Sequence, residues 1–138
     1  MRAHHFESDN ELVKAVLGRI EDFIYFVDIN GDGSRTVRYV GPHLEKVLGI
    51  SRELFTADPF SLHDRVHPDD QESVAETALR LKTEKKPQTL IYRFYNDQQE
   101  KYTWLEESVF PQVDEQGRHH AYLGIFRNVS ERVERENA

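Results

Sequence analysis

The sequence contains no cysteine among its 138 residues. Disulfide bonds, thiolate metal sites, iron–sulfur clusters and thiol nucleophiles are therefore excluded for this chain. The sequence also has no apolar run close to the roughly 20 residues with which a helix crosses a bilayer. Its first residues have neither the basic start nor the apolar middle of a signal peptide. These absences predict a cytoplasmic domain, or a cytosolic piece of a larger protein, without a membrane span.

Positive charge is also scarce, because 18 lysines and arginines are outnumbered by 25 aspartates and glutamates, for a formal net charge of −7 at pH 7. The densest basic spot is Lys85-Lys86, at an expected helix end where cations suit the helix dipole. Nonspecific binding to nucleic acids or anionic membranes depends on a basic face, so neither partner is expected. The composition, 38% hydrophobic and 31% charged, favours a single folded domain.

The first expected element is an amphipathic helix. The segment Ser8–Glu11 is typical of a capping box, and apolar residues at helical spacing continue to about Glu21. A β-rich run over 23–29 and a second over 36–40 flank the turn-forming segment 28–33, which predicts a hairpin. The apolar stripe of the helix, which is expected to pack on the sheet or on a second protomer, consists of Val13, Val16, Leu17 and Ile20.

Helices are expected in the middle of the chain. Three short helical pieces lie between Gly41 and Val66. A longer helix begins at His67-Pro68-Asp69-Asp70, because proline is tolerated and acidic residues are favoured in a first turn, and Pro87 ends it. Its buried face is expected to contain Val74, Ala78 and Leu81.

Three further strands are expected over 89–95, 102–113 and 119–129, separated by polar turns. Short connections make consecutive strands pair in chain order, which predicts an antiparallel meander. The whole order of elements therefore indicates an α+β domain whose helices gather against one sheet.

Several segments, taken in this order, resemble the PAS (sensory box) family. The resemblance rests on their combination in the right order. The ending Asn128–Arg132 is close to the Asp-Ile-Thr-Glu-Arg that closes many PAS domains. The matching segments in chain order are Tyr39–Pro42 with Val47–Ser51, His67–Asp70, Tyr92–Phe94 with Trp104, Asp114–Gly117, and Gly124–Arg132.

The resemblance implies a five-stranded antiparallel sheet with short helices and one longer helix on one face, plus an N-terminal cap helix. It implies a cap over 1–22, the PAS domain over 23–130 and the start of a C-terminal connector helix over 131–138. It further implies a non-catalytic sensor, often a homodimer, that binds a small ligand or a partner. Its terminal helices would pass the change to an output module in the parent protein, such as a histidine kinase of a two-component system, a cyclic-dinucleotide enzyme or a transcription regulator.

The identity of any cofactor stays open. PAS domains that form a flavin adduct or carry a thioester-linked coumaroyl group need a cysteine, so the absence of cysteine excludes both. Haem-binding members often supply an axial histidine from the long helix, and the segment Gln71–Glu84 has none. Haem is therefore not expected.

Aromatic side chains are expected on both faces of the sheet, and both faces must then be covered. By resemblance, the helices cover one face and leave a small cavity; the alternative is a filled core without a ligand. Arg93 and Glu107 are expected to pair across adjacent strands. The candidate cavity residues are Phe26, Tyr39, Leu62, Val66, Val74, Ala78, Tyr92, Leu123 and Ile125.

The C-terminal end is the expected exit for a signal. Ser130 is placed to cap a helix that begins with Glu131 and Arg132. Asn128 stands where the family usually has aspartate, so an ion pair expected there would become a neutral hydrogen bond. The candidate signal-transfer residues are thus Asn128, Ser130, Glu131 and Arg132.

Parts of the sequence also fit other functions. The segment Asp28–Gly33 opens like a calcium loop, but its twelfth position is Tyr39 rather than glutamate. A metal cluster at His63, Asp64, His67, Asp69 and Asp70 competes with a simple helix start, and Pro68 disfavours the helical geometry that a shared site needs. No metal is expected. A ligand-free dimerisation module, and a small enzyme using an enclosed carboxylate such as Asp64 or Glu106, are the alternatives to a sensor.

Overall fold

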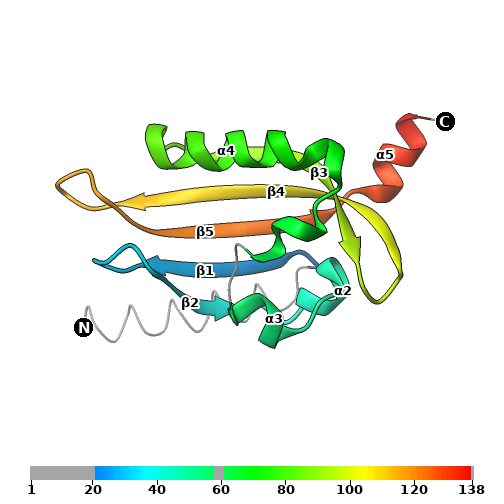
Figure 1. Ribbon diagram of the computed structural model, residues 1–138, viewed down its shortest axis with the longest axis horizontal. Helices are drawn as coiled ribbons and strands as arrows, with labels where there is room; N and C mark the ends of the chain where they lie inside the picture. Colours follow the sequence, from blue (N-terminus) through cyan, green and yellow to red (C-terminus); the bar gives the residue numbers. More distant parts are fainter. Residues whose placement is uncertain (1–20, 58–60, 138) are drawn as a thin grey trace.

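The computed structural model describes residues 21–57 and 61–137. Two strands come first, β1 (Phe23–Ile29) and β2 (Arg35–Val40). Five helical segments follow, and three strands and a last helix complete the chain (Figure 1). The helical segments are α2 (Leu44–Leu48), α3 (Arg52–Ala57), η1 (Ser61–Arg65), η2 (Pro68–Asp70) and α4 (Gln71–Glu84), and the last elements are β3 (Gln88–Asn96), β4 (Lys101–Val113), β5 (His119–Asn128) and α5 (Ser130–Glu136).

All five strands form one antiparallel sheet in the order β2-β1-β5-β4-β3. The three C-terminal strands pair consecutively because their turns are short, and β1 completes the sheet by pairing with β5. The expected α+β class and antiparallel sheet are therefore confirmed. Among residues 21–57 and 61–137, none of the helices has the length and apolar character that crossing a bilayer requires.

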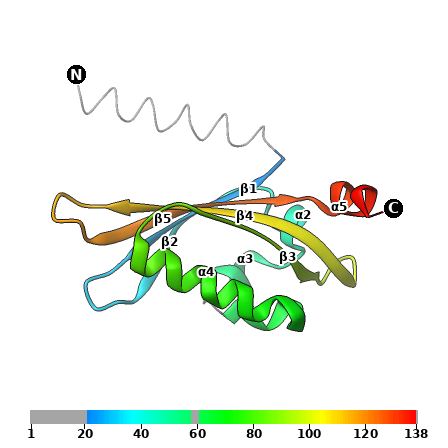
Figure 2. The same ribbon diagram turned by 90° about the horizontal axis from the view of Figure 1, so that it is seen from above.

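One face of the sheet, called here the inner face, carries the core. Because side chains alternate along a strand, the buried Phe23, Tyr25 and Val27 of β1 share the inner face, as do Tyr92 and Phe94 of β3. Figure 2 shows α3 and α4 on the same side of the sheet. Leu44, Val47 and Leu48 of α2 and Phe55 of α3 join this core.

The two long strands at the sheet centre set the positions of the site residues. Leu105 of β4 is fully buried on the inner face, so Glu107 and Val109, at two-residue steps, lie on the same face. Irregular register occurs between Phe26 and Val27 and between Gln112 and Val113. Such bulges change the local alternation of side chains.

The long helix α4 departs from the sequence expectation. Val74 and Leu81 are only half-buried, Ala78 is exposed, and none of its residues is buried. The segment Pro68–Asp70 is a separate 3₁₀ turn rather than the first turn of the helix. The α4 helix thus covers the inner face without packing tightly against it.

The N-terminal stripe Val13, Val16, Leu17 and Ile20 lies outside the described residues. The expected cap helix, and the dimer or cap interface assigned to it, stay predictions. At the other end α5 begins at Ser130, one residue before the expected connector, and the domain boundaries remain an expectation.

Candidate functional site

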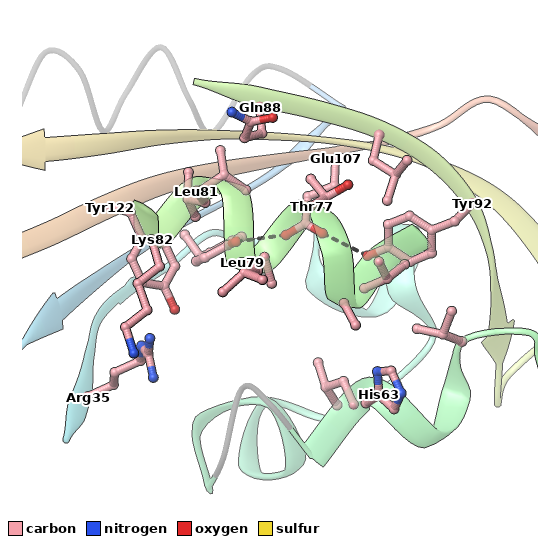
Figure 3. Close-up of a pocket in the computed structure, with 18 of the residues that line it drawn as sticks. Arg35, His63, Thr77, Leu79, Leu81, Lys82, Gln88, Tyr92, Glu107 and Tyr122 are labelled. Carbon is pink, nitrogen blue, oxygen red and sulfur yellow. Dashed lines mark hydrogen bonds between the residues drawn. The ribbon is translucent and has the colours of Figure 1, made fainter. Parts of the chain in front are cut away.

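A cavity of about 880 Å³ lies between α4 and the inner face of the sheet (Figure 3). Its volume lies within the range of small-molecule sites, about 300–1,000 Å³. Besides α4, the walls come from all five strands and from α3 and η1. The apolar part of the lining consists mainly of Ile29, Phe55, Leu62, Val66, Val74, Leu81, Leu90, Phe94, Val109 and Phe126.

The cavity exists because α4 is attached near its two ends. Before its first turn, both Asp70 carboxylate oxygens accept from the Arg93 guanidinium at 2.9 Å, and Asp70 Oδ2 also accepts from the Arg93 backbone N–H at 2.8 Å. Just past its end, Lys85 adopts a left-handed conformation and donates from Nζ to the Gly117 carbonyl at 2.8 Å. Between these anchors no residue of α4 is buried, so space remains beneath the helix.

The segment that precedes α4 also helps to hold the N-terminal end of the helix. Val66 forms a β-bridge with Phe94, and its carbonyl accepts from Gln71 Nε2 at 3.0 Å. His67 donates its backbone N–H to the Arg93 carbonyl at 2.9 Å, while its Nδ1 accepts from the Asp69 N–H. Residues 66–71 therefore hold the start of α4 against the β3 edge.

A carboxyl group lies in the wall of this largely apolar cavity. Glu107 Oε2 accepts from the Tyr25 hydroxyl and Oε1 from the Tyr92 hydroxyl, each at 2.8 Å. The three residues come from β1, β3 and β4, so the cluster joins strands that are not all neighbours in the sheet. Glu107 is half-buried and lines the cavity, which makes it available to a bound molecule.

Gly124 makes room for this cluster. It pairs with Tyr25 across β1 and β5, and a Cβ at this position would collide with the Tyr25 ring. A glycine at this inner-face position of β5 therefore leaves the space that the Tyr25 ring occupies, and the Tyr25 hydroxyl reaches Glu107 from there.

The electrostatics of the cluster follow from its burial. Loss of water raises the pKa of Glu107, and the two phenol hydrogen bonds lower it only in part. Burial, and then the nearby Glu107 charge, hold the pKa values of Tyr25 and Tyr92 well above their usual range. Burial also raises the pKa of Tyr122 to about 12, although a hydrogen bond and the charge of Arg35 oppose it. The phenols therefore stay protonated donors at physiological pH.

The end of the cavity beside Tyr122 carries basic side chains. Arg35 and Lys82 lie near Tyr122 there, away from Tyr92 (Figure 3). Burial lowers the pKa of His119, which also lines the cavity, so its ring is neutral at pH 7. Its Nε2 is buried and has no hydrogen-bond partner within the described ranges.

The structure places the predicted cavity residues on two different faces. Leu62, Val66, Val74, Ala78 and Tyr92 line the cavity. The other four do not line it. Since Tyr25 and Phe126 point inward, alternation puts Phe26 and Ile125 on the opposite face, and the partners Tyr39 and Leu123 of Phe26 lie there too. The four corrected residues are Phe26, Tyr39, Leu123 and Ile125.

The expected Arg93–Glu107 pair does not form. Arg93 lies opposite Trp104 in the register, and Glu107 lies opposite Leu90, so the two charges are on different faces of the sheet. Arg93 instead pairs with Asp70, and its guanidinium carbon lies 4.9 Å from the centre of the Trp104 ring. Sequence reasoning missed Glu107 as a cavity residue, although its two-residue spacing from Leu105 and Val109 signals the inner face.

A family model described as PAS fold matches residues 37–126, which include β3, β4 and most of β5, with Tyr92 and Glu107 of the cavity wall. The chain belongs to the PAS-fold family. No curated protein matches the chain.

Solved structures with the PAS fold agree with this assignment. The N-terminal domain of a Marinobacter aquaeolei diguanylate cyclase with a PAS/PAC sensor is 23% identical; the match covers 80% of this chain and 98% of that one, with a TM-score of 0.66. A domain of a putative light and redox sensing histidine kinase from Haloarcula marismortui is 19% identical over 86% and 98%, with a TM-score of 0.66. A sensory box histidine kinase/response regulator from Burkholderia thailandensis is 15% identical over 91% and 89%, with a TM-score of 0.68.

The C-terminal end of the PAS domain is bound to β4. The Trp104 backbone N–H donates to Ser130 Oγ at 2.7 Å, and the Val129 backbone N–H donates to the Trp104 carbonyl at 2.8 Å. Asn128 Oδ1 accepts from the Ser130 N–H at 2.9 Å, a neutral hydrogen bond. Arg132 lies 3.7 Å from Glu106, while Glu131 is exposed. The start of α5 therefore depends on the strand that carries Glu107.

The remaining candidates are explained by local contacts. In the loop considered for calcium, Asp28 pairs with Arg38 at 2.8 Å and Asp32 accepts from Ser34. No set of three or more histidine, aspartate or glutamate side chains in the described part of the chain is placed to hold a metal. Of the carboxylates considered for an enzyme, Asp64 is exposed and Glu106 is next to Glu107 on the opposite face.

Proposed function

We propose that this PAS domain is the sensor module of a signalling protein, and that a small molecule bound beneath α4 is the signal it detects. The observation that carries the proposal is the cavity itself, which is about 880 Å³ in volume and closed on one side by a helix with no buried residue. The family supports a regulatory role rather than a catalytic one.

The described contacts suggest how binding reaches the end of the chain. A molecule in the cavity touches α4 and the inner face of β4, where Glu107 lies. Three residues earlier on β4, the backbone of Trp104 holds Ser130 and Val129. A shift of β4 therefore changes the hydrogen bonds that position the start of α5. A ligand produces this change only if it binds one arrangement more tightly than the other.

By analogy with the similar diguanylate cyclase and histidine kinases, the output is a kinase or a cyclic-dinucleotide enzyme in the parent protein. A cytoplasmic location accords with such outputs. The charged helix α5 would connect to that module.

A thermal-shift screen of small organic molecules tests the proposal. A molecule that binds only the folded state adds about 2.7 kcal/mol of stability when its concentration is 100 times its Kd. We expect Ala78→Phe, which fills the cavity from α4, to weaken such binding at least about tenfold. Ser73→Phe, at an exposed position of α4 that does not line the cavity, is the matched control. Equal binding to the wild type and to Ala78→Phe would place the site elsewhere and contradict the proposal.

A second candidate function is dimerisation through the opposite face of the sheet. Phe26, Tyr39, Leu123 and Ile125 lie there half-buried, and Ile91 is exposed. Such a face supports packing against a second protomer, and a homodimer would then bring two output modules together. Sedimentation velocity over a range of protein concentrations tests this: the wild type should associate, and Ile125→Glu should shift it toward the monomer. A wild-type protein that stays monomeric throughout would contradict it.

A further inference from the structure

We propose that the cavity selects an amphipathic organic cation, with its ammonium group beside Glu107 and its apolar body beneath α4. The inference rests on the proposed ligand-sensing function and adds to it the chemical class of the ligand. It starts from a charged group whose hydrogen-bond partners supply no opposite charge.

Glu107 has donors but lacks a counter-charge. Its two oxygens accept one hydrogen bond each, from the neutral hydroxyls of Tyr25 and Tyr92. In the part of the chain that the structure describes, no lysine, arginine or histidine forms an ion pair with it. A carboxylate has about four lone-pair positions, so capacity remains for a donor from the cavity. Charges removed from water bind an opposite charge strongly, because the desolvation cost of the carboxylate is already present without a ligand.

The surroundings of Glu107 also suit a cation. Aromatic rings attract a positive charge placed over their faces. Six aromatic residues line the cavity, and two of them are the tyrosines that bind Glu107 directly. The others are Phe55, Phe94, Tyr122 and Phe126. A ligand with an ammonium group and an apolar body therefore finds a partner for each part.

The cavity lining also contains basic residues, but their attraction for an anion is weaker than the attraction of Glu107 for a cation. Arg35, Lys82 and Lys85 are exposed, so water and salt screen their charges. Arg35 hydrogen bonds with Tyr122, and Lys85 donates to the Gly117 carbonyl. Glu107, in contrast, is half-buried and hydrogen bonded to the buried Tyr25 and Tyr92, so water screens its charge less. An anionic ligand would have to leave its charge at the exposed end.

Calorimetric titration with a matched series of three probes tests the inference. The probes are 4-phenylbutylamine, 4-phenylbutan-1-ol and 4-phenylbutanoate, which share one apolar body and differ in charge. At about pH 7 we expect the amine to bind at least about tenfold more tightly than the alcohol, with the carboxylate weakest. We expect Glu107→Gln to reduce the amine-to-alcohol ratio to within about twofold, because the amide has no charge. Glu106→Gln, one residue away on the opposite face, should leave the ratio unchanged.

The outcomes separate the inference from the sensor function. Equal binding of the amine and the alcohol to the wild type would overturn the cation preference while leaving a ligand cavity. Preference for the carboxylate would overturn it in favour of an anion. Binding of none of the three would also overturn it, and the broader screen with Ala78→Phe would then decide the sensor function separately.

A pH series on the wild-type protein gives the same answer if Glu107→Gln does not fold. The amine stays protonated, so its advantage over the alcohol should fall as pH is lowered through the raised pKa of Glu107. Tyr25, Tyr92 and Tyr122 face Glu107 but keep their protons in this range. His63 and His119 also line the cavity, and repeating the series with both replaced by glutamine removes any contribution of the imidazole rings. An advantage that stays constant with pH would contradict the inference.

Discussion

The carboxyl group of Glu107 shows how much a single residue depends on the kind of partner it meets. Two phenol hydrogen bonds satisfy its oxygens, yet its pKa is raised, because the phenols donate without adding positive charge. The opposite case is Asp70, whose pKa is lowered chiefly by the hydrogen bonds that it accepts from Arg93. Two acids of similar chemistry therefore have opposite roles, one facing a cavity and the other anchoring a helix.

The raised pKa of Glu107 predicts a pH dependence of stability. The folded protein keeps the proton above pH 4.5, the ordinary pKa of the side chain, while the unfolded chain releases it. The folded state then binds more protons, so the free energy of unfolding falls as pH rises through this window. We expect the wild type to lose stability relative to Glu107→Gln between about pH 4.5 and the raised pKa. Urea unfolding at several pH values measures this, and a relative gain of the wild type would contradict it.

Gly124 gives a prediction about space rather than charge. In Gly124→Ala the new methyl group would collide with the Tyr25 ring, and overpacking of this kind costs about 1–3 kcal/mol. We expect urea unfolding to show a loss of that size. Gly31→Ala is the control: a Cβ there meets nothing within 4 Å, so its effect should stay within about 0.5 kcal/mol. Equal stability of the two variants would rule out the close approach of Tyr25 to β5.

At the scale of elements, α4 is the unusual part of the fold. Its start is held by Asp70 and Arg93 and its end by Lys85, while its middle lies over the cavity. A helix stabilised mainly at its ends has few buried contacts to lose when it moves. This arrangement suits an element that responds to the contents of the cavity.

The Asp70–Arg93 pair predicts how firmly α4 is held. Their side chains are 18% and 28% exposed, so water screens the pair only in part. We expect Asp70→Asn to lower the free energy of unfolding by about 1–2 kcal/mol and to speed amide exchange in the first turns of α4. Asp69→Asn is the matched control, since its side chain is 75% exposed and its effect should be small. If both variants behave alike, the anchor does not hold the helix.

The strands and the pairing of consecutive strands follow from the sequence for plain physical reasons, whereas the pairing of β1 with β5 does not, because no short turn joins them. Turn-forming residues such as Asn30 to Gly33 and Asp114 to Gly117 separate β-rich runs, and short turns leave adjacent antiparallel pairing as the available topology. The strand ends differ from expectation by a residue at most. The gap beneath α4 could not be predicted, because Val74, Ala78 and Leu81 have the same spacing whether the helix packs tightly or stands away from the sheet.

The face on which a strand residue lies was harder to predict than the strand itself. Phe23, Tyr25 and Phe26 put aromatic rings on both faces of β1, so hydrophobicity alone does not show which side is inner. Phe26, Tyr39, Leu123 and Ile125 were expected in the cavity and lie on the other face. Applying strict alternation from Tyr92 and its partner Leu105 would have placed Glu107 in the cavity and Arg93 away from it.

At the scale of the whole molecule, the sheet separates two surfaces with different roles. The inner face, beneath α4, holds the cavity and the Glu107 cluster, and the opposite face carries apolar side chains with Trp104 and Arg93. The β4 strand contributes to both surfaces. It carries Glu107 on the inner face, and its Trp104 backbone binds the start of α5. The proposed signal therefore has a short route from the cavity to the end of the chain.

Hydrogen–deuterium exchange tests this account most directly, when measured with and without a molecule selected by the thermal-shift screen. Without the molecule, the amides of α4 should exchange faster than those of β4 and β5, because local opening of α4 exposes few buried groups. At saturation, exchange in α4 should slow markedly while β5 changes little. An α4 as protected as β5 in the free protein, or an exchange rate of α4 that binding leaves unchanged, would contradict the claim that the ligand lies beneath this helix.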